Sequence, residues 1–141
     1  MIFLKQKLNG ILKRIRCYSY GIFYLRNADF KISDTLKINK KIEHFKFINL
    51  ESEAFQYEFT EICLNDCYQL NLINKWKKDI KTIVDVGVNQ GLFSIAARQH
   101  FPTAILHGYE PNQQLREILL HNSQKLNSMF FYEAVIMVLA V

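Results

Sequence analysis

The chain has 141 residues, half of them apolar and 22% charged, which is the composition of one ordinary folded domain rather than of a disordered chain. Its formal net charge is +5, but residues 1–26 carry six Lys and Arg and no Asp or Glu, whereas residues 27–141 carry 12 basic and 13 acidic residues. The positive charge therefore belongs to the N-terminal segment, and a nucleic-acid-binding surface spread over the whole domain is disfavoured.

The sequence also disfavours membrane-spanning and secreted classes of protein. It contains no run of 18 apolar residues, and Lys and Arg interrupt the apolar residues near its start. Cys17, Cys63 and Cys67 are too few and too irregularly spaced for a disulfide framework, and no histidine pair completes a zinc motif. We therefore expect a cytoplasmic protein with free thiols and no metal site.

The first 54 residues are predicted to form a basic, mixed extension. Apolar residues over 2–16 recur at helical spacing with Lys and Arg between them, which predicts a helix. Two interpretations of this helix are open: a packing helix with a solvated basic face, which we favour, and a basic amphipathic helix that lies on an anionic membrane. The aromatic segment 18–26 is expected to pack on the domain, and residues 27–50 suggest short strands and loops.

Residues 55–81 precede the main strand–helix pattern. Apolar and polar residues alternate over much of 55–64, which predicts a half-buried strand. Asn65 and Asp66 have the chemistry of a turn. Residues 67–78 then predict a short helix that ends in a basic cluster.

The C-terminal part predicts an α/β sheet. A β-branched run over 82–86 is followed by a helix over 92–100, a strand over 104–109, a helix over 112–126 and a strand over 129–135. Strands that alternate with helices of crossover length form an open parallel sheet with right-handed crossovers. We expect a Rossmann-like domain over residues 55–141.

Four residues place a candidate cofactor site at the carboxyl ends of the first two strands. Asp85, Gly87 and Gly91 follow the first strand, and Glu110 ends the second. This layout holds an adenosine-containing cofactor. A dinucleotide site needs Gly-x-Gly-x-x-Gly, but Asn89 and Leu92 occupy its second and third glycine positions. An NAD-dependent oxidoreductase with a degenerate glycine loop is therefore the alternative rather than the leading interpretation.

The carboxylate of Asp85 favours a cationic cofactor over a pyrophosphate. S-adenosylmethionine carries a sulfonium and an ammonium group and no phosphate, so Asp85 would stabilise it directly or through water. Gly87 and Gly91 would let the loop backbone approach its methionine part, and Glu110 would accept hydrogen bonds from the ribose hydroxyls. Asn89 is either a left-handed loop residue or a residue with a role near the cofactor.

The same residues resemble the FkbM-type methyltransferases. That family has the pattern Asp-x-Gly-Ala-Asn-x-Gly with Glu-Pro-Asn closing the second strand, and here the chain reads Asp-Val-Gly-Val-Asn-Gln-Gly over 85–91 and Tyr-Glu-Pro-Asn over 109–112. Residues 61–68 resemble the segment before the motif, and Asn122 stands where the second helix of the family commonly carries asparagine. The resemblance covers residues 55–135.

The resemblance implies a class I methyltransferase fold with S-adenosylmethionine as methyl donor. It further implies O-methylation of a hydroxyl on a sugar, polyketide or other small molecule. Asp85, Gly87, Asn89 and Gly91 would line the methionine side, Glu110 would bind the ribose, and Tyr68 would close over the cofactor. No catalytic base is indicated, because His100, His107 and His121 are each predicted to be surface or packing residues.

Two departures from the family pattern change what we expect of this chain. Val88 replaces the usual alanine, and the chain ends where the family continues into an adenine-contacting loop and four more strands. We therefore expect a truncated sheet with half a cofactor site, little methyl transfer, and self-association through an unpaired edge at residues 82–86. The non-enzymatic alternative is a membrane-peripheral or partner-binding remnant.

Overall fold

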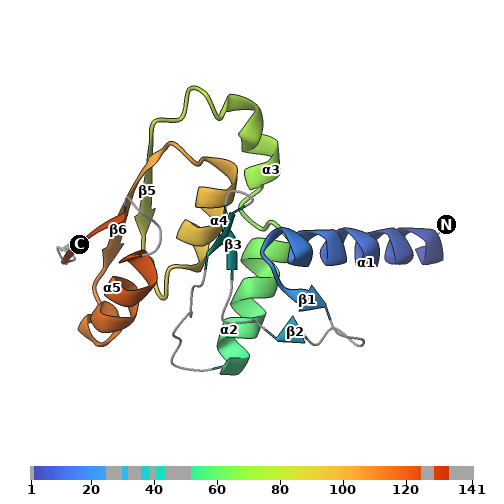
Figure 1. Ribbon diagram of the computed structural model, residues 1–141, viewed down its shortest axis with the longest axis horizontal. Helices are drawn as coiled ribbons and strands as arrows, with labels where there is room; N and C mark the ends of the chain where they lie inside the picture. The colour runs from blue at the N-terminus through green and yellow to red at the C-terminus, as the bar shows by residue number, and fades with distance from the viewer. Residues whose placement is uncertain are drawn as a thin grey trace, which may run out of the picture.

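The fold is mixed α/β around a three-stranded parallel sheet (Figure 1). The computed structural model describes residues 2–24, 30–31, 36–38, 41–43, 52–124 and 129–133. The strands are β5 (Thr82–Val86), β6 (Ile105–Glu110) and β7 (Met129–Glu133), in the order β5-β6-β7 and all parallel. The three predicted strands and their parallel arrangement are confirmed, and residues 134–135 lie outside the described residues.

The two connections between the strands are helical, as the sequence predicts. α4 (Leu92–His100) links β5 to β6, and η3 (Gln113–Leu115) with α5 (Arg116–Gln124) links β6 to β7. Asn112 caps the second connection, because its Oδ1 accepts a hydrogen bond from Gln114 N at 3.0 Å. The last two residues of the predicted 112–126 helix lie outside the described part of the chain.

The main core joins α4 to segments far earlier in the sequence. A single cluster of buried residues contains Leu92, Ile95 and Ala96 of α4 together with side chains from before residue 65 (Cys17, Tyr20, Ile22, Phe55, Phe59, Cys63 and Leu64). Burial of apolar side chains on this scale is the main source of folding free energy. The N-terminal residues 17–22 thus share their core with the sheet domain, and the predicted boundary at residue 54 stays a prediction.

The predicted strand over 55–64 is wrong. α2 (Ser52–Phe59) continues there into η1 (Thr60–Leu64), a single turn of π-helix. Phe55, Phe59 and Cys63 are buried at intervals of four residues, whereas Tyr57 is 71% exposed. The helical period of burial therefore outweighs the apolar alternation, because an amphipathic helix buries positions three and four apart.

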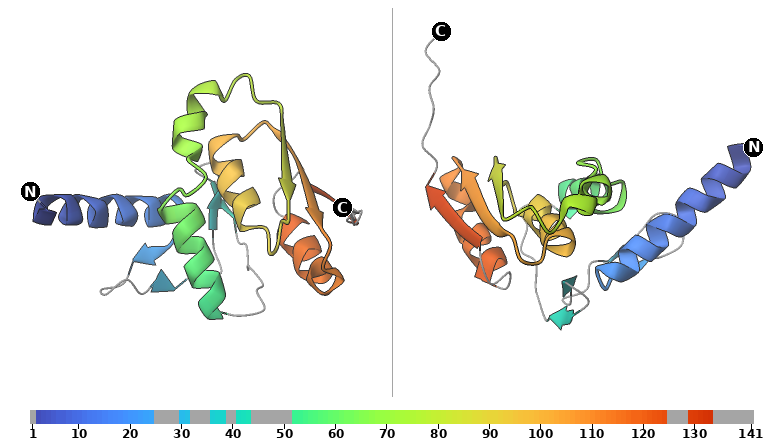
Figure 2. Two further views of the ribbon diagram at one scale, coloured as in Figure 1. Left: turned by 180° about the vertical axis from the view of Figure 1, so that it is seen from behind. Right: turned by 90° about the horizontal axis from the view of Figure 1, so that it is seen from above.

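The helix predicted over 2–16 is confirmed as α1 (Ile2–Ser19), and it projects from the body of the protein (Figures 1 and 2). Its C-terminal end packs into the core through Cys17. The apolar residues Leu8, Ile11, Leu12 and Ile15 are 46% to 58% exposed. The favoured interpretation, in which these residues pack and the basic face is solvated, is therefore contradicted. In the described part of the chain, α1 included, no helix combines the length and the apolar character that a membrane span needs.

Short elements complete the fold. β1 (Phe23–Tyr24) pairs with β2 (Phe30–Lys31), and β3 (Leu36–Ile38) pairs with β4 (Lys41–Glu43), both antiparallel. Of these, β2, β3 and β4 confirm the short strands predicted within residues 27–50. The helix predicted over 67–78 is shorter, since it comprises α3 (Leu70–Ile73) and η2 (Asn74–Trp76) after a left-handed Gln69.

One face and one edge of the sheet are open in the described structure. Within the described residues β5 has β6 on one side and no strand on the other. Val84 and Val86 are 58% and 81% exposed, whereas Ile83 packs against the core on the opposite face. Register pairs Val84 with His107 and Val86 with Tyr109, so one sheet face carries these side chains. An apolar open edge of this kind favours pairing between chains.

We expect Val84→Lys to reduce self-association of the chain. A lysine in the middle of an edge strand opposes pairing with another strand through charge and solvation. Light scattering coupled to size-exclusion chromatography should then show smaller species than the unsubstituted chain. Leu120→Lys on α5, also at an exposed leucine, is the control. Equal size distributions for the two variants would contradict the edge as the association site.

Candidate functional site

The loop between β5 and α4 is built on left-handed backbone. Gly87, Asn89 and Gly91 have φ angles of +80°, +51° and +91°. Both positions have room for a side chain. A Cβ added at Gly87 would meet no atom within 4 Å, and one added at Gly91 would meet only the Leu119 side chain, at 3.8 Å. Glycine is therefore favoured at both positions by backbone conformation rather than by lack of space. Asn89 is a left-handed loop residue, as one of its two interpretations expects.

Hydrogen bonds from the loop backbone fasten it to the end of β6. Gly87 N and Val88 N both donate to Tyr109 O, at 2.9 and 3.2 Å. The carboxylate of Glu110 continues this contact, because its Oε2 accepts from Asn89 N at 2.8 Å and its Oε1 accepts from Asn112 N at 2.8 Å. Glu110 thus joins the loops that follow two neighbouring strands, and its two oxygens retain lone pairs for a ligand.

A buried amide supports the loop from α5. Asn122 is 2% exposed, and its Nδ2 donates to Gln90 O at 3.0 Å. A small apolar cluster of Val88, Leu115, Ile118 and Leu119 packs beside this contact. The asparagine that the sequence places in the second helix therefore has a positioning role in the loop.

The structure brings four of the six predicted site residues around one cavity of about 230 Å³. Tyr68, Asp85, Gly87 and Asn89 line it. Glu110 is linked to it through Asn89, whereas Gly91 forms the N-cap of α4 behind the lining. The predicted residues are therefore assembled in one place, although two of them are not part of the cavity wall.

Glu58 belongs to the same cavity and was missed in the sequence. Its Oε1 accepts a hydrogen bond from Asn89 Nδ2 at 2.8 Å, so Glu58 fixes the side chain of Asn89 in the same lining that contains Asp85. Because residues 55–64 were incorrectly predicted to form a strand, Glu58 was not among the predicted site residues. The helical spacing of Phe55, Phe59 and Cys63 is the signal that could have placed Glu58 on a helix beside the loop.

The lining carries negative charge in a partly desolvated place. Burial raises the pKa of Asp85, Ser94 Oγ offsets this by a hydrogen bond to Asp85 Oδ2 at 3.3 Å, and the nearby Glu110 charge raises it further. Burial also raises the pKa of Glu58, against the opposing effect of Asn89. Among the described residues, neither Lys nor Arg nor His lines this cavity. A ligand with positive charge would relieve the unfavourable burial of these carboxylates.

Tyr68 lies at the rim of the cavity. Its ring is 53% exposed and meets the Phe93 ring edge-on, with centroids 4.8 Å apart. An aromatic ring in this position can cover a ligand without leaving its own packing contact.

Among the described residues, no three His, Cys, Asp or Glu side chains lie close enough together to hold a metal ion.

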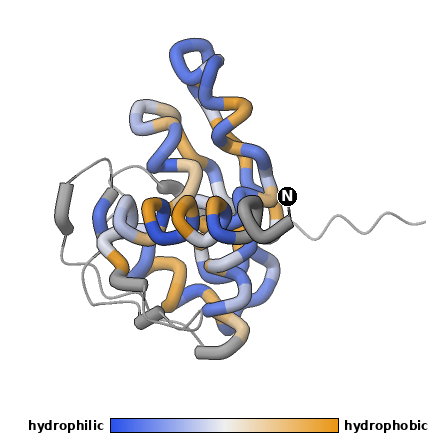
Figure 3. Tube along the Cα trace, turned by 90° about the vertical axis from the view of Figure 1, so that its right-hand side faces the viewer, coloured by the Kyte–Doolittle hydropathy of each residue, from blue (hydrophilic) through white to orange (hydrophobic). Residues whose placement is uncertain are grey.

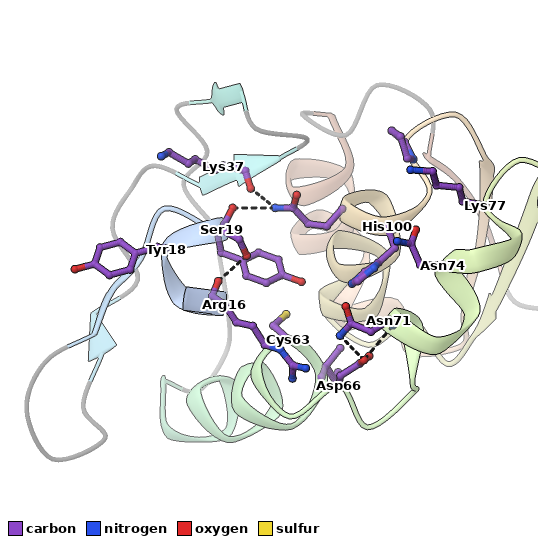
Figure 4. Close-up of a pocket in the computed structure, with 14 residues that line it drawn as sticks. Arg16, Tyr18, Ser19, Lys37, Cys63, Asp66, Asn71, Asn74, Lys77 and His100 are labelled. Atoms are coloured by element: carbon purple, nitrogen blue, oxygen red, sulfur yellow. Dashed lines mark hydrogen bonds between the residues drawn. The ribbon is translucent and has the colours of Figure 1, made fainter. Parts of the chain in front are cut away.

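A larger cavity of about 560 Å³ lies at the opposite end of α4 (Figure 4). It contains none of the predicted cofactor residues and is lined by basic residues, including Arg16, Lys37 and Lys77. Asp66 also lines it, but its carboxylate accepts hydrogen bonds from Leu70 N, Asn71 N and Asn71 Nδ2. The loop, the strand ends and the carboxylates of the predicted cofactor site meet at the smaller cavity instead.

The three histidines named above lie away from the smaller cavity. His100 lines the larger cavity, where burial lowers its pKa. His107 is half-buried in β6, and His121 is half-buried on α5. None of them is in the lining that contains Asp85.

No known family's sequence profile matches the chain, and no curated protein matches it. Among solved structures, the chain is similar to a protein from Staphylococcus aureus that carries the provisional name caffeoyl-CoA O-methyltransferase, with 19% sequence identity and a TM-score of 0.43. The similarity covers 61% of this chain and 45% of that one, so the chain spans less than half the length of that structure.

Asp85→Asn should stabilise the fold at neutral pH. The folded-state pKa of Asp85 is raised, so the free energy of unfolding falls as pH rises through that pKa, and the neutral amide removes this loss. Thermal unfolding should show a higher Tm than the unsubstituted chain at pH 7, with the gain shrinking towards about pH 4.

Asp79→Asn, at an exposed position, is the matched control for this pH dependence. It should leave the Tm profile unchanged. A gain in Asp85→Asn that is the same at both ends of the pH range would contradict burial of the charge as its cause.

Asn122→Ala should lower the free energy of unfolding by about 1–3 kcal/mol, the usual cost of losing a buried hydrogen-bonding group. The substitution removes the contact to Gln90 O that supports the loop. Denaturant unfolding would measure it, with Glu117→Ala at an exposed position of the same helix as control. A loss no larger than that of the control would show that the loop does not depend on Asn122.

Proposed function

We propose that this chain binds S-adenosylmethionine at the smaller cavity and forms the cofactor-binding part of a methyltransferase. One observation carries the proposal. Asp85 and Glu110 stand at the carboxyl ends of neighbouring parallel strands, connected by a left-handed glycine loop, over an acidic cavity whose described lining has no basic residue. Carboxylates in this arrangement suit a cofactor that carries a sulfonium and an ammonium group.

Each residue has a proposed role that follows from its place. Asp85, Gly87, Asn89 and Gly91 hold the methionine side of the cofactor, and Glu110 accepts hydrogen bonds from the ribose hydroxyls. Tyr68 covers the cofactor from the rim. Glu58 positions Asn89 through their 2.8 Å hydrogen bond.

The size of the cavity indicates how much of the cofactor these residues enclose. Its 230 Å³ is below the roughly 300–1,000 Å³ of complete small-molecule sites. We infer that this wall holds the methionine and sulfonium part, where Asp85 lies. The open sheet face beside Val86 would leave the rest of the cofactor less enclosed.

The proposed reaction depends on positioning. When bound, S-adenosylmethionine would supply an electrophilic methyl group for transfer to a hydroxyl oxygen, with its sulfur left as a thioether and the hydroxyl proton passed to solvent. The chain's residues hold the donor so that donor and acceptor can lie in line. No catalytic base is assigned.

The finer assignment rests on the motif in the sequence. The resemblance of residues 85–91 and 109–112 to the FkbM pattern supports O-methylation of a hydroxyl on a sugar or other small molecule. The oxidoreductase alternative has less support, because a pyrophosphate would meet Asp85 and Glu58 without a basic side chain to balance them in the described lining.

Calorimetric titration of the chain tests the proposal. S-adenosylmethionine or its demethylated product should bind, and NAD should not. Glu110→Gln should weaken binding by about 1–3 kcal/mol, since it removes a charge-assisted hydrogen bond while keeping the shape of the side chain.

Glu117→Gln is the matched control, because it removes a carboxylate at an exposed position of α5. It should bind like the unsubstituted chain. Unchanged affinity in Glu110→Gln would remove Glu110 from the ribose site. Binding of NAD in preference to S-adenosylmethionine would favour the oxidoreductase instead.

A further inference from the structure

We propose that α1 is a docking surface for anionic membrane, on which the helix lies in the plane of the lipid headgroups. The inference does not depend on the proposed cofactor. It rests on the direction in which the helix presents its apolar residues, a fact that the sequence pattern leaves open.

The apolar residues of α1 form one stripe on its surface. Leu8, Ile11, Leu12 and Ile15 follow the spacing i, i+3, i+4, i+7, which places them along one side of a helix. All four are at least 46% exposed, and Tyr18 extends the stripe at 56%. Figure 3 shows hydrophobic and hydrophilic colours alternating along these turns. We call these five residues the outer stripe.

The outer stripe faces away from the protein body. Cys17, fully buried in the core, comes nine residues after Leu8 and therefore lies about 180° around the helix from it at 3.6 residues per turn. The helix thus contacts the domain on the side opposite its apolar stripe. A packing helix has the reverse arrangement, because its apolar side is the one that the core covers.

Positive charge flanks the outer stripe. Lys7 and Arg14, seven residues apart, follow one border of the stripe. Arg16, near the other border, turns its guanidinium towards the protein body, where Nη1 donates to Leu64 O. α1 contains five basic residues and no acidic one. A helix with a narrow apolar stripe bordered by Lys and Arg has the composition of an interfacial helix, whose apolar side enters the headgroup region while its cations meet anionic lipid.

Charge complementarity selects an anionic membrane over a second copy of the chain. Two copies that paired through their outer stripes would bring Lys7 and Arg14 of each helix together, without an acidic residue on α1 to balance them. An anionic bilayer provides both an apolar layer and a negative surface. Tyr18 suits the same boundary, because its ring is apolar and its hydroxyl polar.

Co-sedimentation of the full chain with lipid vesicles tests the proposal. We expect binding to vesicles of phosphatidylcholine with phosphatidylserine and much weaker binding to phosphatidylcholine alone. Binding should decrease as salt rises past physiological ionic strength, where screening acts within about 8 Å. Lys7→Gln/Arg14→Gln should bind several-fold more weakly and show a shallower salt dependence.

The apolar contribution has its own pair of variants. Ile11→Ser/Ile15→Ser should reduce binding to anionic vesicles at least about tenfold, since each methylene removed from the interface weakens it. Leu72→Ser removes an equally exposed leucine from α3 and should bind like the unsubstituted chain. Both positions of the double variant are exposed, so its Tm and circular dichroism spectrum should match those of the unsubstituted chain. This control distinguishes a loss of membrane binding from a loss of folding.

Three outcomes would overturn the proposal. One is equal binding to neutral and anionic vesicles, and another is binding that survives Ile11→Ser/Ile15→Ser. The third is no vesicle binding at all. If the third occurs together with oligomers that the same double substitution disperses, the outer stripe is an interface between copies of this chain.

Discussion

The hydrogen bond from Asn89 N to Glu110 Oε2 is the contact on which the candidate site depends. It joins the loop after β5 to the end of β6 at 2.8 Å, next to the two bonds that Tyr109 O accepts from Gly87 and Val88. Parallel strands bring their carboxyl ends to one edge of a sheet, but their loops are free to diverge. Here the loop is fastened by backbone donors and a carboxylate acceptor. Asp85, the loop and Glu110 therefore keep one arrangement.

Support for this contact comes from both sides of the loop. Asn122 holds Gln90 from α5, and Glu58 holds Asn89 from α2. The chain directly after α2 makes a π-helical turn, and such turns occur often at functional sites. The N-terminal segment contributes by packing Cys17, Tyr20 and Ile22 against α2 and α4. Residues distant in the sequence thus fix the walls of a small acidic cavity.

The sheet and its loop could be predicted from the sequence because their signals are local. The β-branched run over 82–86 and the glycines at 87 and 91 each specify their own conformation. The segment 55–64 was mispredicted because Phe55, Tyr57 and Phe59 satisfy an alternating pattern, and only tertiary packing decides that Tyr57 is exposed. Glu58 was missed for the same reason. The direction that the apolar stripe of α1 faces could not be predicted either, because periodicity shows that a helix has an apolar side but not whether that side faces the core or the solvent.

The way the loop is fastened also has a consequence for its amide hydrogens. Loop amides usually exchange with solvent quickly, because few of them are hydrogen-bonded. Here three consecutive amides, those of Gly87, Val88 and Asn89, all donate to groups at the end of β6. They should exchange at rates closer to those of the sheet than to those of a surface loop. The amide of Asn89 donates to a carboxylate rather than to a carbonyl, so its exchange rate is a direct reporter of the state of Glu110.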